Sequence, residues 1–323
     1  MSRRVLITGA SGFVGKVLAR ALHAEDISTV GLVRTAGTAP DVDVEWALDG
    51  SDFGNIDERW MQGLRCDSVV HLAARVHVMR DTAFDPLASY RATNVEGTLR
   101  VARAARRAGA VRFVYVSSIK AVAESSTGRP PLDEQCPAAP SDPYGISKLE
   151  AEQALRAYGA ESGLEIVIVR PPLVYGPAVR ANFRRMMDAV ARGIPLPLGA
   201  ITARRSVVYV GNLADALLQC VTDPRAAGEC FHVADDDAPS VTGLLRLVGD
   251  ALGKPARLVP VPPAVLQAIG AMVGRSAAVD RVTGSLQLDT GRITRVLGWH
   301  PPYTTRQGLE ATAAWYRSRD TQQ

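Results

Sequence analysis

The sequence predicts an α/β fold in which helices cover both faces of a doubly wound parallel sheet. Short, mostly apolar runs recur along the first half of the chain, at Val5 to Thr8, Thr29 to Val33, Ser68 to Leu72, Val111 to Val116 and Glu165 to Val169. Such runs are typical of strands buried on both faces. Segments with helical spacing, such as Val95 to Ala108, lie between them. This alternation of strand and helix implies a parallel sheet.

Composition places the chain among ordinary globular proteins. Its 323 residues are 47% hydrophobic and 22% charged, which suffices for one large two-lobed unit or two modest domains. The net charge is only +4 and the basic residues are spread along the chain, so no nucleic-acid partner is expected, although a basic pocket for an anionic ligand stays open. The apolar stretch from Ala264 to Gly274 is too short to span a membrane.

The cysteines and the N-terminus indicate the compartment. No Cys-x-x-Cys spacing or disulfide framework joins the four cysteines, which are Cys66, Cys136, Cys220 and Cys230. We therefore expect reduced thiols, no metal site and a cytoplasmic location. Arg3 and Arg4 precede an apolar run as they would in a signal peptide, but glycines interrupt that run and no clean cleavage site follows.

A glycine-rich turn follows the first predicted strand. The first glycine of such a turn permits the tight bend, the second lets the backbone approach a pyrophosphate, and the third allows close packing of helix on strand. Amides at the helix N-terminus then bind the anion. The sequence therefore predicts a Rossmann-type dinucleotide site built from Gly9, Ser11, Gly12, Phe13, Val14 and Gly15.

The end of the second strand bears on which dinucleotide is bound. An acid there commonly binds the ribose 2'-hydroxyl of NAD, and an arginine the 2'-phosphate of NADP. This strand ends in Val33 and Arg34 with no acid, which favours NADP(H) over NAD; the alternative is that Arg34 faces solvent or stacks on adenine. Asp49 is a candidate for the adenine amino group, or an ordinary turn residue.

The next strand supplies further candidates for cofactor binding. It ends in Leu72, Ala73 and Ala74, small enough for a dinucleotide to pass beside the backbone. His71, in an apolar setting, is expected in the core and not as a catalyst. Asn94 either supports the sheet behind the site or caps the following helix.

A tyrosine and a lysine four residues apart, Tyr144 and Lys148, fall on one face of a predicted helix. Pro143 suits the first helical position, and Ser141 or Asp142 can cap the amides before it. A nearby cation favours a phenolate, so we expect the pKa of the tyrosine to be lowered. Such a tyrosine can pass a proton to or from a substrate hydroxyl.

These motifs together resemble the extended short-chain dehydrogenases/reductases. The glycine turn, Ala73-Ala74, Ser117-Ser118 at a strand end and the Tyr-x-x-x-Lys pair occur in that order. More narrowly, the chain looks like the NAD(P)-dependent epimerase/dehydratase family of nucleotide-sugar enzymes. The similarity covers nearly the full length and continues through Arg170 to Pro177, Arg205 to Leu213 and Val296 to Pro301.

The resemblance implies roles for the candidate residues. Tyr144 would be the acid/base and would also contact the cofactor, and Lys148 would hold the nicotinamide ribose and lower the pKa of the tyrosine. Ser118, or alternatively Ser117, would hydrogen-bond the reacting sugar oxygen, and Pro171 would join the cofactor contacts. The resemblance also implies a homodimer packed through helices.

The resemblance further implies a smaller, mixed C-terminal substrate lobe. The dinucleotide domain would comprise residues 1–170 and a returning segment of about 203–235, and the lobe residues 171–202 and 236–323. Contacts to the substrate diphosphate are expected from Asn182, Arg205 and Arg281, since the planar fork of an arginine suits a diphosphate.

Two departures from the family pattern narrow the expected reaction. Family dehydratases carry an Asp-Glu pair after the catalytic hydroxyl residue, whereas this chain has Ile119 and Lys120. The following residues also lack the Tyr-Gly of many 4-epimerases, and look more like bacterial O-antigen sugar reductases and epimerases. We therefore expect reduction of a 4-keto-sugar or 4-epimerisation of a nucleotide-diphospho-sugar, in surface polysaccharide synthesis. A reductase of steroid or phenolic ketones and a non-catalytic dinucleotide sensor are the alternatives.

Overall fold

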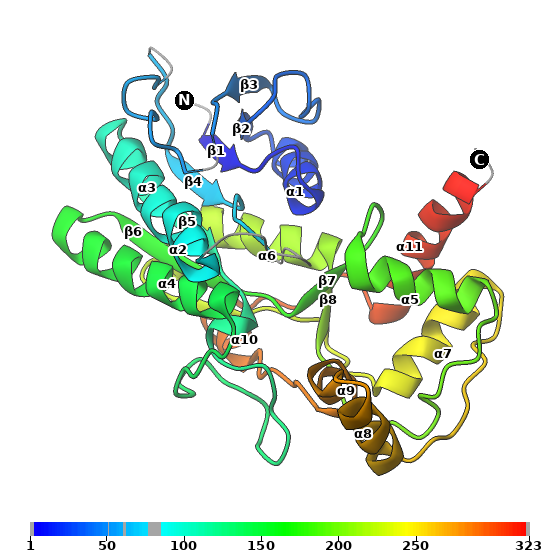
Figure 1. Cartoon of the computed structure of the whole chain (residues 1–323). Coiled ribbons are helices and arrows are strands. Elements are labelled where there is room, and N and C mark those ends of the chain that lie inside the picture. Colours follow the sequence, from blue (N-terminus) through cyan, green and yellow to red (C-terminus); the bar gives the residue numbers. More distant parts are fainter. Residues whose placement is uncertain (1–2, 51, 61–62, 77–84, 321–323) are drawn as a thin grey trace.

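The computed structural model describes residues 3–50, 52–60, 63–76 and 85–320. Among these residues, seven parallel strands form one central sheet in the order β3-β2-β1-β4-β5-β6-β9 (Figure 1). The strands are β1 (Arg4–Thr8), β2 (Ser28–Val33), β3 (Val44–Ala47), β4 (Ser68–His71), β5 (Arg112–Val116), β6 (Glu165–Arg170) and β9 (Cys230–His232). The predicted α/β fold with a parallel sheet is confirmed.

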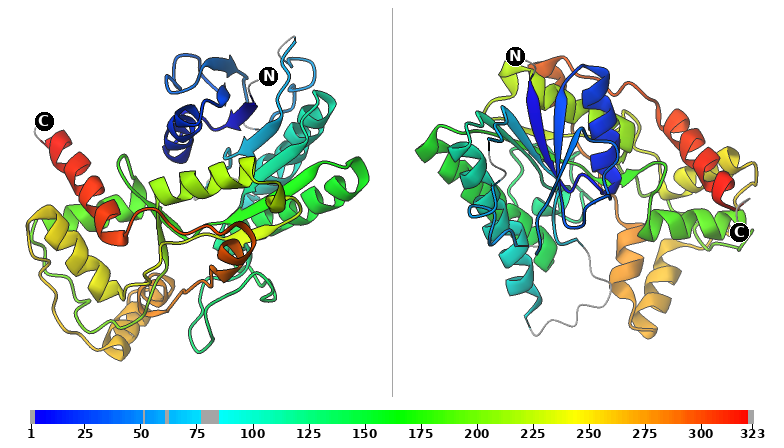
Figure 2. Two further views of the ribbon diagram at one scale, coloured as in Figure 1. Left: turned by 180° about the vertical axis from the view of Figure 1, so that it is seen from behind. Right: turned by 90° about the horizontal axis from the view of Figure 1, so that it is seen from above.

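Helices cover both faces of the sheet. One face packs against α1 (Phe13–Ala24) and α6 (Val210–Thr222), and the other against α3 (Thr98–Arg107) and α4 (Pro143–Ser162), as the view from above in Figure 2 shows for α1, α3 and α4. Successive strand residues point to opposite faces. The two apolar layers are accordingly distinct, with Ile7 facing α1 and Leu6 facing α3.

The helix predicted over Val95 to Ala108 differs from the one observed. A short helix, α2 (Pro86–Arg91), leads into a π-helical turn, η1 (Ala92–Gly97), and the regular helix α3 begins only at Thr98. A Cβ on Gly97 would lie 3.0 Å from the carbonyl oxygen of Asp52, so the wide turn brings backbone against backbone. π-turns are frequent at functional sites, and this one places Asn94.

A second, smaller lobe follows β6. Its short strand β7 (Leu173–Tyr175) pairs in parallel with β8 (Val207–Tyr209), which lies in the segment that returns to the sheet. Its core lies among α5, α7 and α11, which gather beside the sheet in both views of Figure 2. The remaining elements are η2 (Ile119–Ala121), α5 (Ala181–Ala191), η3 (Pro224–Ala226), α7 (Val241–Leu252), α8 (Pro263–Met272), α9 (Ser276–Thr283), α10 (Gly291–Leu297) and α11 (Thr305–Asp320).

A buried carboxylate joins the two lobes. Asp235, which follows β9, accepts hydrogen bonds from the hydroxyl of Tyr175 at 2.8 Å, the side-chain amide of Asn212 at 2.7 Å and the backbone amide of Tyr209 at 2.9 Å. Burial raises the pKa of Asp235, and these donors oppose the rise. Because the partners come from β7, β8 and α6, the carboxylate fixes the chain where it returns from the lobe to the sheet.

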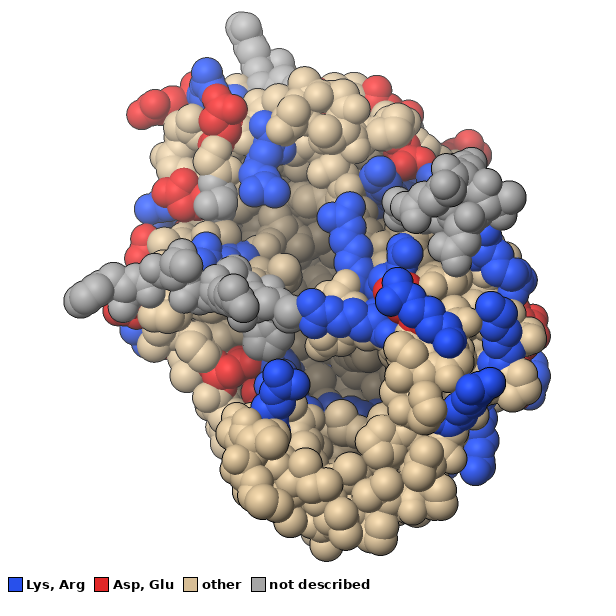
Figure 3. Space-filling view, turned by 45° about the vertical axis from the view of Figure 1, so that its right-hand side comes forward, with Lys and Arg blue, Asp and Glu red and all other residues tan. Residues whose placement is uncertain are grey.

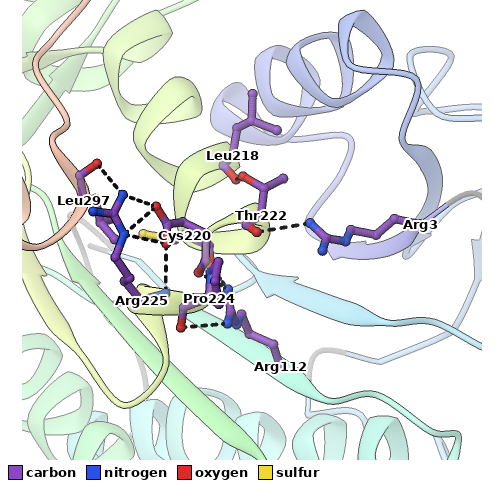
Figure 4. A network of polar contacts seen from close by, with 9 residues as sticks. Arg3, Arg112, Leu218, Cys220, Thr222, Pro224, Arg225 and Leu297 are labelled. Atoms are coloured by element: carbon purple, nitrogen blue, oxygen red, sulfur yellow. Dashed lines mark hydrogen bonds and ion pairs between the residues drawn. The ribbon is translucent and has the colours of Figure 1, made fainter.

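An arginine lies at the amino ends of the strands, at the end of the sheet opposite to the cavity. Arg112 is buried, and its guanidinium donates to the carbonyls of Cys220 at 3.0 Å and Pro224 at 3.5 Å (Figure 4). It also donates to the carbonyl of Asp223 at 2.6 Å and to the carboxylate of Glu165 at 2.8 Å. The last carbonyls of a helix lack partners within it and carry partial negative charge. Arg112 therefore caps the C-terminus of α6.

A buried ion pair holds α4 against the sheet. Arg170, at the end of β6, donates from Nε to Glu152 Oε1 at 2.9 Å and from a terminal nitrogen to the other oxygen. The side chains of Arg170 and Glu152 are only 7% and 2% exposed. We predict that Glu152→Ala lowers the free energy of unfolding by ~3–5 kcal/mol, because it leaves a buried guanidinium without its anion.

Urea unfolding followed by circular dichroism measures this loss. Glu150→Ala is the matched control, since Glu150 lies on the same helix and pairs with Arg91 at the surface, where the side chains are 30% and 47% exposed. Surface pairs contribute little, so the control should unfold nearly as the wild type does. Equal losses in both variants would contradict the prediction.

Candidate active site

A cavity of about 380 Å³ opens at the carboxyl ends of β1, β2 and β4. The strand order reverses between β1 and β4, which is where parallel α/β sheets bind ligands. Seven of the residues expected at the dinucleotide line this cavity, namely Gly9, Ser11, Gly12, Arg34, Leu72, Ala73 and Ala74. Others were not anticipated, including Leu48, Gly50, Phe53, Arg75 and Thr93.

The glycine turn has the geometry that a pyrophosphate requires. Gly9 has a φ of 70°, in the region that favours glycine, and its carbonyl accepts the amide of Gly12 at 2.9 Å. A Cβ on Gly15 would lie 2.4 Å from the carbonyl oxygen of Gly9, so α1 approaches the turn only because this residue is glycine. Phe13 and Val14 are partly buried in the first turn of α1, away from the cavity lining.

No acidic residue lies among the described residues that line the cavity. Arg34 does line it and is exposed. Glu45, on the adjacent strand β3, accepts the backbone amides of Gly37 and Ala39 and is thereby committed to the loop after β2. The carboxylate of Asp49 pairs with Arg59 at 3.2 Å and is 84% exposed, outside the described cavity lining.

A chain of hydrogen bonds in the buried layer next to the cavity connects Asn94, Thr98, His71, Thr8 and Ala73. The hydroxyl of Thr98 donates to the carbonyl of Asn94 at 2.7 Å, so it accepts from His71 Nε2 at 3.0 Å. His71 Nδ1 then accepts from the hydroxyl of Thr8 at 2.9 Å, which in turn accepts the amide of Ala73 at 3.2 Å. Burial lowers the pKa of His71 to about 3. The imidazole is therefore a neutral structural link, as its apolar setting predicted.

Asn94 lies behind the site and not in the described cavity lining. Its amide oxygen accepts the backbone amide of Arg75 at 2.8 Å, and its nitrogen donates to the carbonyl of Arg75 at 3.0 Å and to the hydroxyl of Ser147 at 3.0 Å. Ser147 donates to the carbonyl of Tyr144 at 2.8 Å. Asn94 thus ties the segment after β4 to the first turn of α4.

Two hydroxyl groups meet at the end of β5. Ser118 begins the η2 turn and Tyr144 lies in the first turn of α4, where Asp142 caps the amide of Gly145 at 2.7 Å. Burial raises the pKa of Tyr144, and a hydrogen bond with Ser118 opposes the rise. The fallback residue, Ser117, is buried, and its hydroxyl bonds to no described residue.

The expected lowering of the tyrosine pKa by Lys148 is not found. The ammonium donates to the hydroxyl of Tyr115 at 3.1 Å and to the carbonyl of Val116 at 2.8 Å, and it lies 6.0 Å from the centre of the Tyr144 ring. Helical spacing does put the two residues on one face, but the lysine is directed to β5, and burial governs the pKa of the phenol. Pro171 lies beneath this site, where its carbonyl accepts the amide of Ile119 at 3.0 Å.

Two of the three predicted substrate residues lie close together: Arg205, in the returning segment, and Arg281, in α9. A guanidinium nitrogen of Arg205 donates to the carbonyls of Arg281 at 2.6 Å and Gly284 at 2.8 Å. Burial and the charge of Arg281 lower the pKa of Arg205. Asn182 is exposed in the first turn of α5 and shows no contact with either arginine among the described residues.

Charge on the hollowed face is mainly basic. Figure 3 shows lysine and arginine side chains around the hollow and few acidic ones at its rim. Over the described residues, no group of three or more His, Cys, Asp or Glu side chains could hold a metal ion. Likewise, no described helix has both the length and the apolar character needed to cross a membrane.

Comparisons with known proteins agree with this geometry. Residues 5–234 match the model of the NAD dependent epimerase/dehydratase family. A UDP-glucose 4-epimerase of Vibrio cholerae is 39% identical over 315 residues, covering 97% of this chain and 95% of that protein. The UDP-glucose 4-epimerase of Thermotoga maritima, solved with UDP-glucose, superposes with a TM-score of 0.78 at 22% identity, covering 98% of this chain and 99% of that one. The Thermus thermophilus UDP-glucose 4-epimerase, solved with NAD, gives 0.77 at 23%, covering 97% and 99%.

The buried lysine leads to a prediction about stability. Burial lowers the pKa of Lys148 to about 7 from an ordinary 10.5, and Glu152 partly offsets this. Below pH of about 7 the amine is charged in the folded and unfolded chain alike, so the cost of burying the charge is fully present. Between about 7 and 10.5 only the unfolded chain still binds the proton, so stability rises with pH.

We therefore predict that the stability of Lys148→Met relative to wild type is greatest at low pH. This difference in the free energy of unfolding should shrink as the pH rises from about 7 to about 10.5. Urea unfolding of both proteins below, within and above the window measures it. Groups common to both proteins cancel in the difference. A difference that does not depend on pH would mean that Lys148 keeps its proton when folded.

Proposed function

The chain belongs to the NAD dependent epimerase/dehydratase family, and from that premise we propose that it is an NAD(P)-dependent oxidoreductase or epimerase acting at C4 of a nucleotide-diphospho-sugar. The observation that carries the proposal is the meeting of Ser118 and Tyr144 with buried Lys148 at the edge of the sheet that holds the glycine-lined cavity. The paired charges of Arg205 and Arg281 support a diphosphate in the substrate.

The three residues have distinct tasks in this proposal. When bound, the nicotinamide supplies or accepts the hydride at the sugar carbon. Tyr144 gives its proton to the sugar oxygen or takes one from it; its raised pKa keeps it protonated at neutral pH, which suits a proton donor. Ser118 donates to the same oxygen and stabilises the developing negative charge. Lys148, with a pKa of about 7, can carry a proton close to the ribose it would hold.

The cofactor is NAD or NADP, and we propose NADP(H) as the preferred form. Arg34 lines the cavity, and no acid stands among the described lining residues to bind a ribose 2'-hydroxyl. The Thermus thermophilus relative, solved with NAD, supports the alternative. The glycine turn and the small residues at the end of β4 suit either dinucleotide.

Two reactions each have a specific observation in their favour. The Vibrio cholerae relative, a UDP-glucose 4-epimerase, favours epimerisation. Arg34 favours NADP(H), and with it reduction of a 4-keto-sugar, which exchanges its cofactor at every turnover. An epimerase keeps its cofactor, since it returns the hydride to the sugar it came from. Nucleotide released on denaturation distinguishes them: stoichiometric NAD(H) supports the epimerase, and an empty protein that binds NADPH supports the reductase.

The proposal extends to the surroundings of the site. Residues 171–202 and 236–323 would form the substrate lobe, with Asn182 at its rim. The cysteines are free thiols, buried or partly buried, which suits a cytoplasmic location. The homodimer remains a prediction of the family resemblance.

We predict that Tyr144→Phe lowers kcat by roughly 10²–10⁴-fold, the usual contribution of a general acid or base. Cofactor affinity should stay unchanged, because the ring is retained and Tyr144 does not line the described cavity. Tyr158→Phe on the same helix, partly buried against the core, is the matched control. Unaltered turnover in the Tyr144 variant would remove the tyrosine from the mechanism.

We further predict that Arg34→Ala weakens NADPH binding by about 10–100-fold, the loss expected for a hydrogen bond to a charged group, and leaves NADH binding nearly unchanged. Fluorescence titration with each dinucleotide measures both affinities. Arg59→Ala, which removes an exposed arginine outside the described lining, is the control. Equal losses for both dinucleotides would contradict a role at the 2'-phosphate.

A further inference from the structure

Lys120 contacts both chain segments that carry the reacting hydroxyls. Its backbone amide donates to the hydroxyl oxygen of Ser118 at 3.2 Å. Its carbonyl oxygen lies against the first turn of α4, where a Cβ on Gly145 would approach it to 2.4 Å. The backbone of one residue thus touches the η2 turn and the helix start that positions Tyr144.

The side chain of Lys120 reinforces the same junction. Its ammonium bonds to Asp142 Oδ2 and lies 3.4 Å from Glu124 Oε1. The other oxygen of Asp142 caps the amide of Gly145 at 2.7 Å. The side chains of Lys120 and Asp142 are only 23% and 19% exposed, so water screens this pair less than it would a surface pair.

The charges around the phenol of Tyr144 come from several elements. Asp142 raises the pKa of Tyr144 by its negative charge, and Lys120 is the cation bonded to that carboxylate. Among the described residues, other charged or titratable groups close to it are Lys148 on α4, Tyr115 on β5, and Tyr90 on α2 with Arg75 over its ring. Glu124, after η2, faces the ammonium of Lys120.

We propose that Lys120 is a positioning residue of the reaction: its ammonium joins the cap of α4 to the η2 turn, holds the hydroxyls of Ser118 and Tyr144 together, and balances the charge of Asp142 beside the phenol. The proposal rests on the proposed function and adds a residue that acts through Asp142. The positive charge of Lys120 is essential to this role, so an acidic residue at position 120 would act in the opposite sense. A glutamate here would face Asp142 with a like charge and weaken the cap, so this site has no place for the acidic pair of the dehydratases.

The first test removes the charge at position 120. Lys120→Met should move the pH limb of kcat that Tyr144 controls upward by roughly one unit, the effect of one nearby charge. Reduction needs the protonated phenol of Tyr144 and oxidation needs its phenolate. Both pH limbs follow the pKa of Tyr144, so both should move to higher pH. Lys120→Arg should restore the limb. Lys254→Met is the matched control, since its ammonium donates to the carbonyl of Ala191 in the other lobe, and it should leave the limb in place.

A double-mutant cycle tests whether Lys120 acts through Asp142. Asparagine caps helices as well as aspartate does, so Asp142→Asn should keep the start of α4 while moving the limb downward. In the Asp142→Asn background the cap of α4 no longer depends on the ion pair, so Lys120→Met should lower kcat less than it does in the wild-type background, although the ammonium's own effect on the limb persists. An equal loss of kcat in both backgrounds, or no shift of the limb in the single variant, would overturn the proposal. A changed KM with an unmoved limb would also overturn it, because Lys120 would then contact the sugar directly.

A readout without sugar separates this proposal from the proposed function. Ultraviolet absorbance follows phenolate formation with rising pH in the dinucleotide-saturated protein, and subtracting the same titration of the variant that also carries Tyr144→Phe isolates Tyr144. Lys120→Met should delay its ionisation and Asp142→Asn should advance it. Absence of turnover on any sugar nucleotide would overturn the proposed function and leave this comparison standing, whereas identical titrations would overturn the role of Lys120.

Discussion

The contact between the first turn of α4 and the η2 turn after β5 is the constraint on which the rest of the site depends. It brings Ser118 and Tyr144, 26 positions apart in the printed sequence, to one place. Gly145 is required there because any Cβ would meet the carbonyl of Lys120 at 2.4 Å. The same helix is held to the sheet by Glu152 and Arg170, so the geometry of two hydroxyls rests on the packing of one helix.

Most buried polar groups near this contact serve the backbone and not the chemistry. The sequence places His71 in the core and makes Asn94 a candidate for cofactor binding. Both residues are hydrogen-bonded to structural partners: His71 to two threonine hydroxyls, and Asn94 to the backbone of Arg75 and to Ser147. A buried donor or acceptor without a hydrogen-bond partner costs free energy. Residues such as His71 and Asn94 supply these partners and thereby hold the cavity walls in place.

The sequence predicted the sheet, the glycine turn and the tyrosine–lysine pair because each depends on local pattern: apolar runs, glycine spacing and helical spacing. It did not predict the wall formed by Leu48, Gly50 and Phe53, which comes from the segment after β3 that has no regular pattern. Nor did it predict the direction of the Lys148 ammonium, since residues on one helix face can point to different neighbours. The short strand β9 was missed because it is only three residues long.

Burial acts in opposite senses on the two central titratable groups. It raises the pKa of Tyr144 and lowers that of Lys148 to about 7, because desolvation always disfavours the charged form. At neutral pH the phenol is therefore uncharged and the amine is close to its midpoint, so the site holds little net charge before reaction. A proton leaving Tyr144 creates a phenolate that Ser118 can stabilise by a hydrogen bond, whereas the Lys148 amine, directed to β5 and 6.0 Å from the centre of the Tyr144 ring, acts at the neighbouring part of the site.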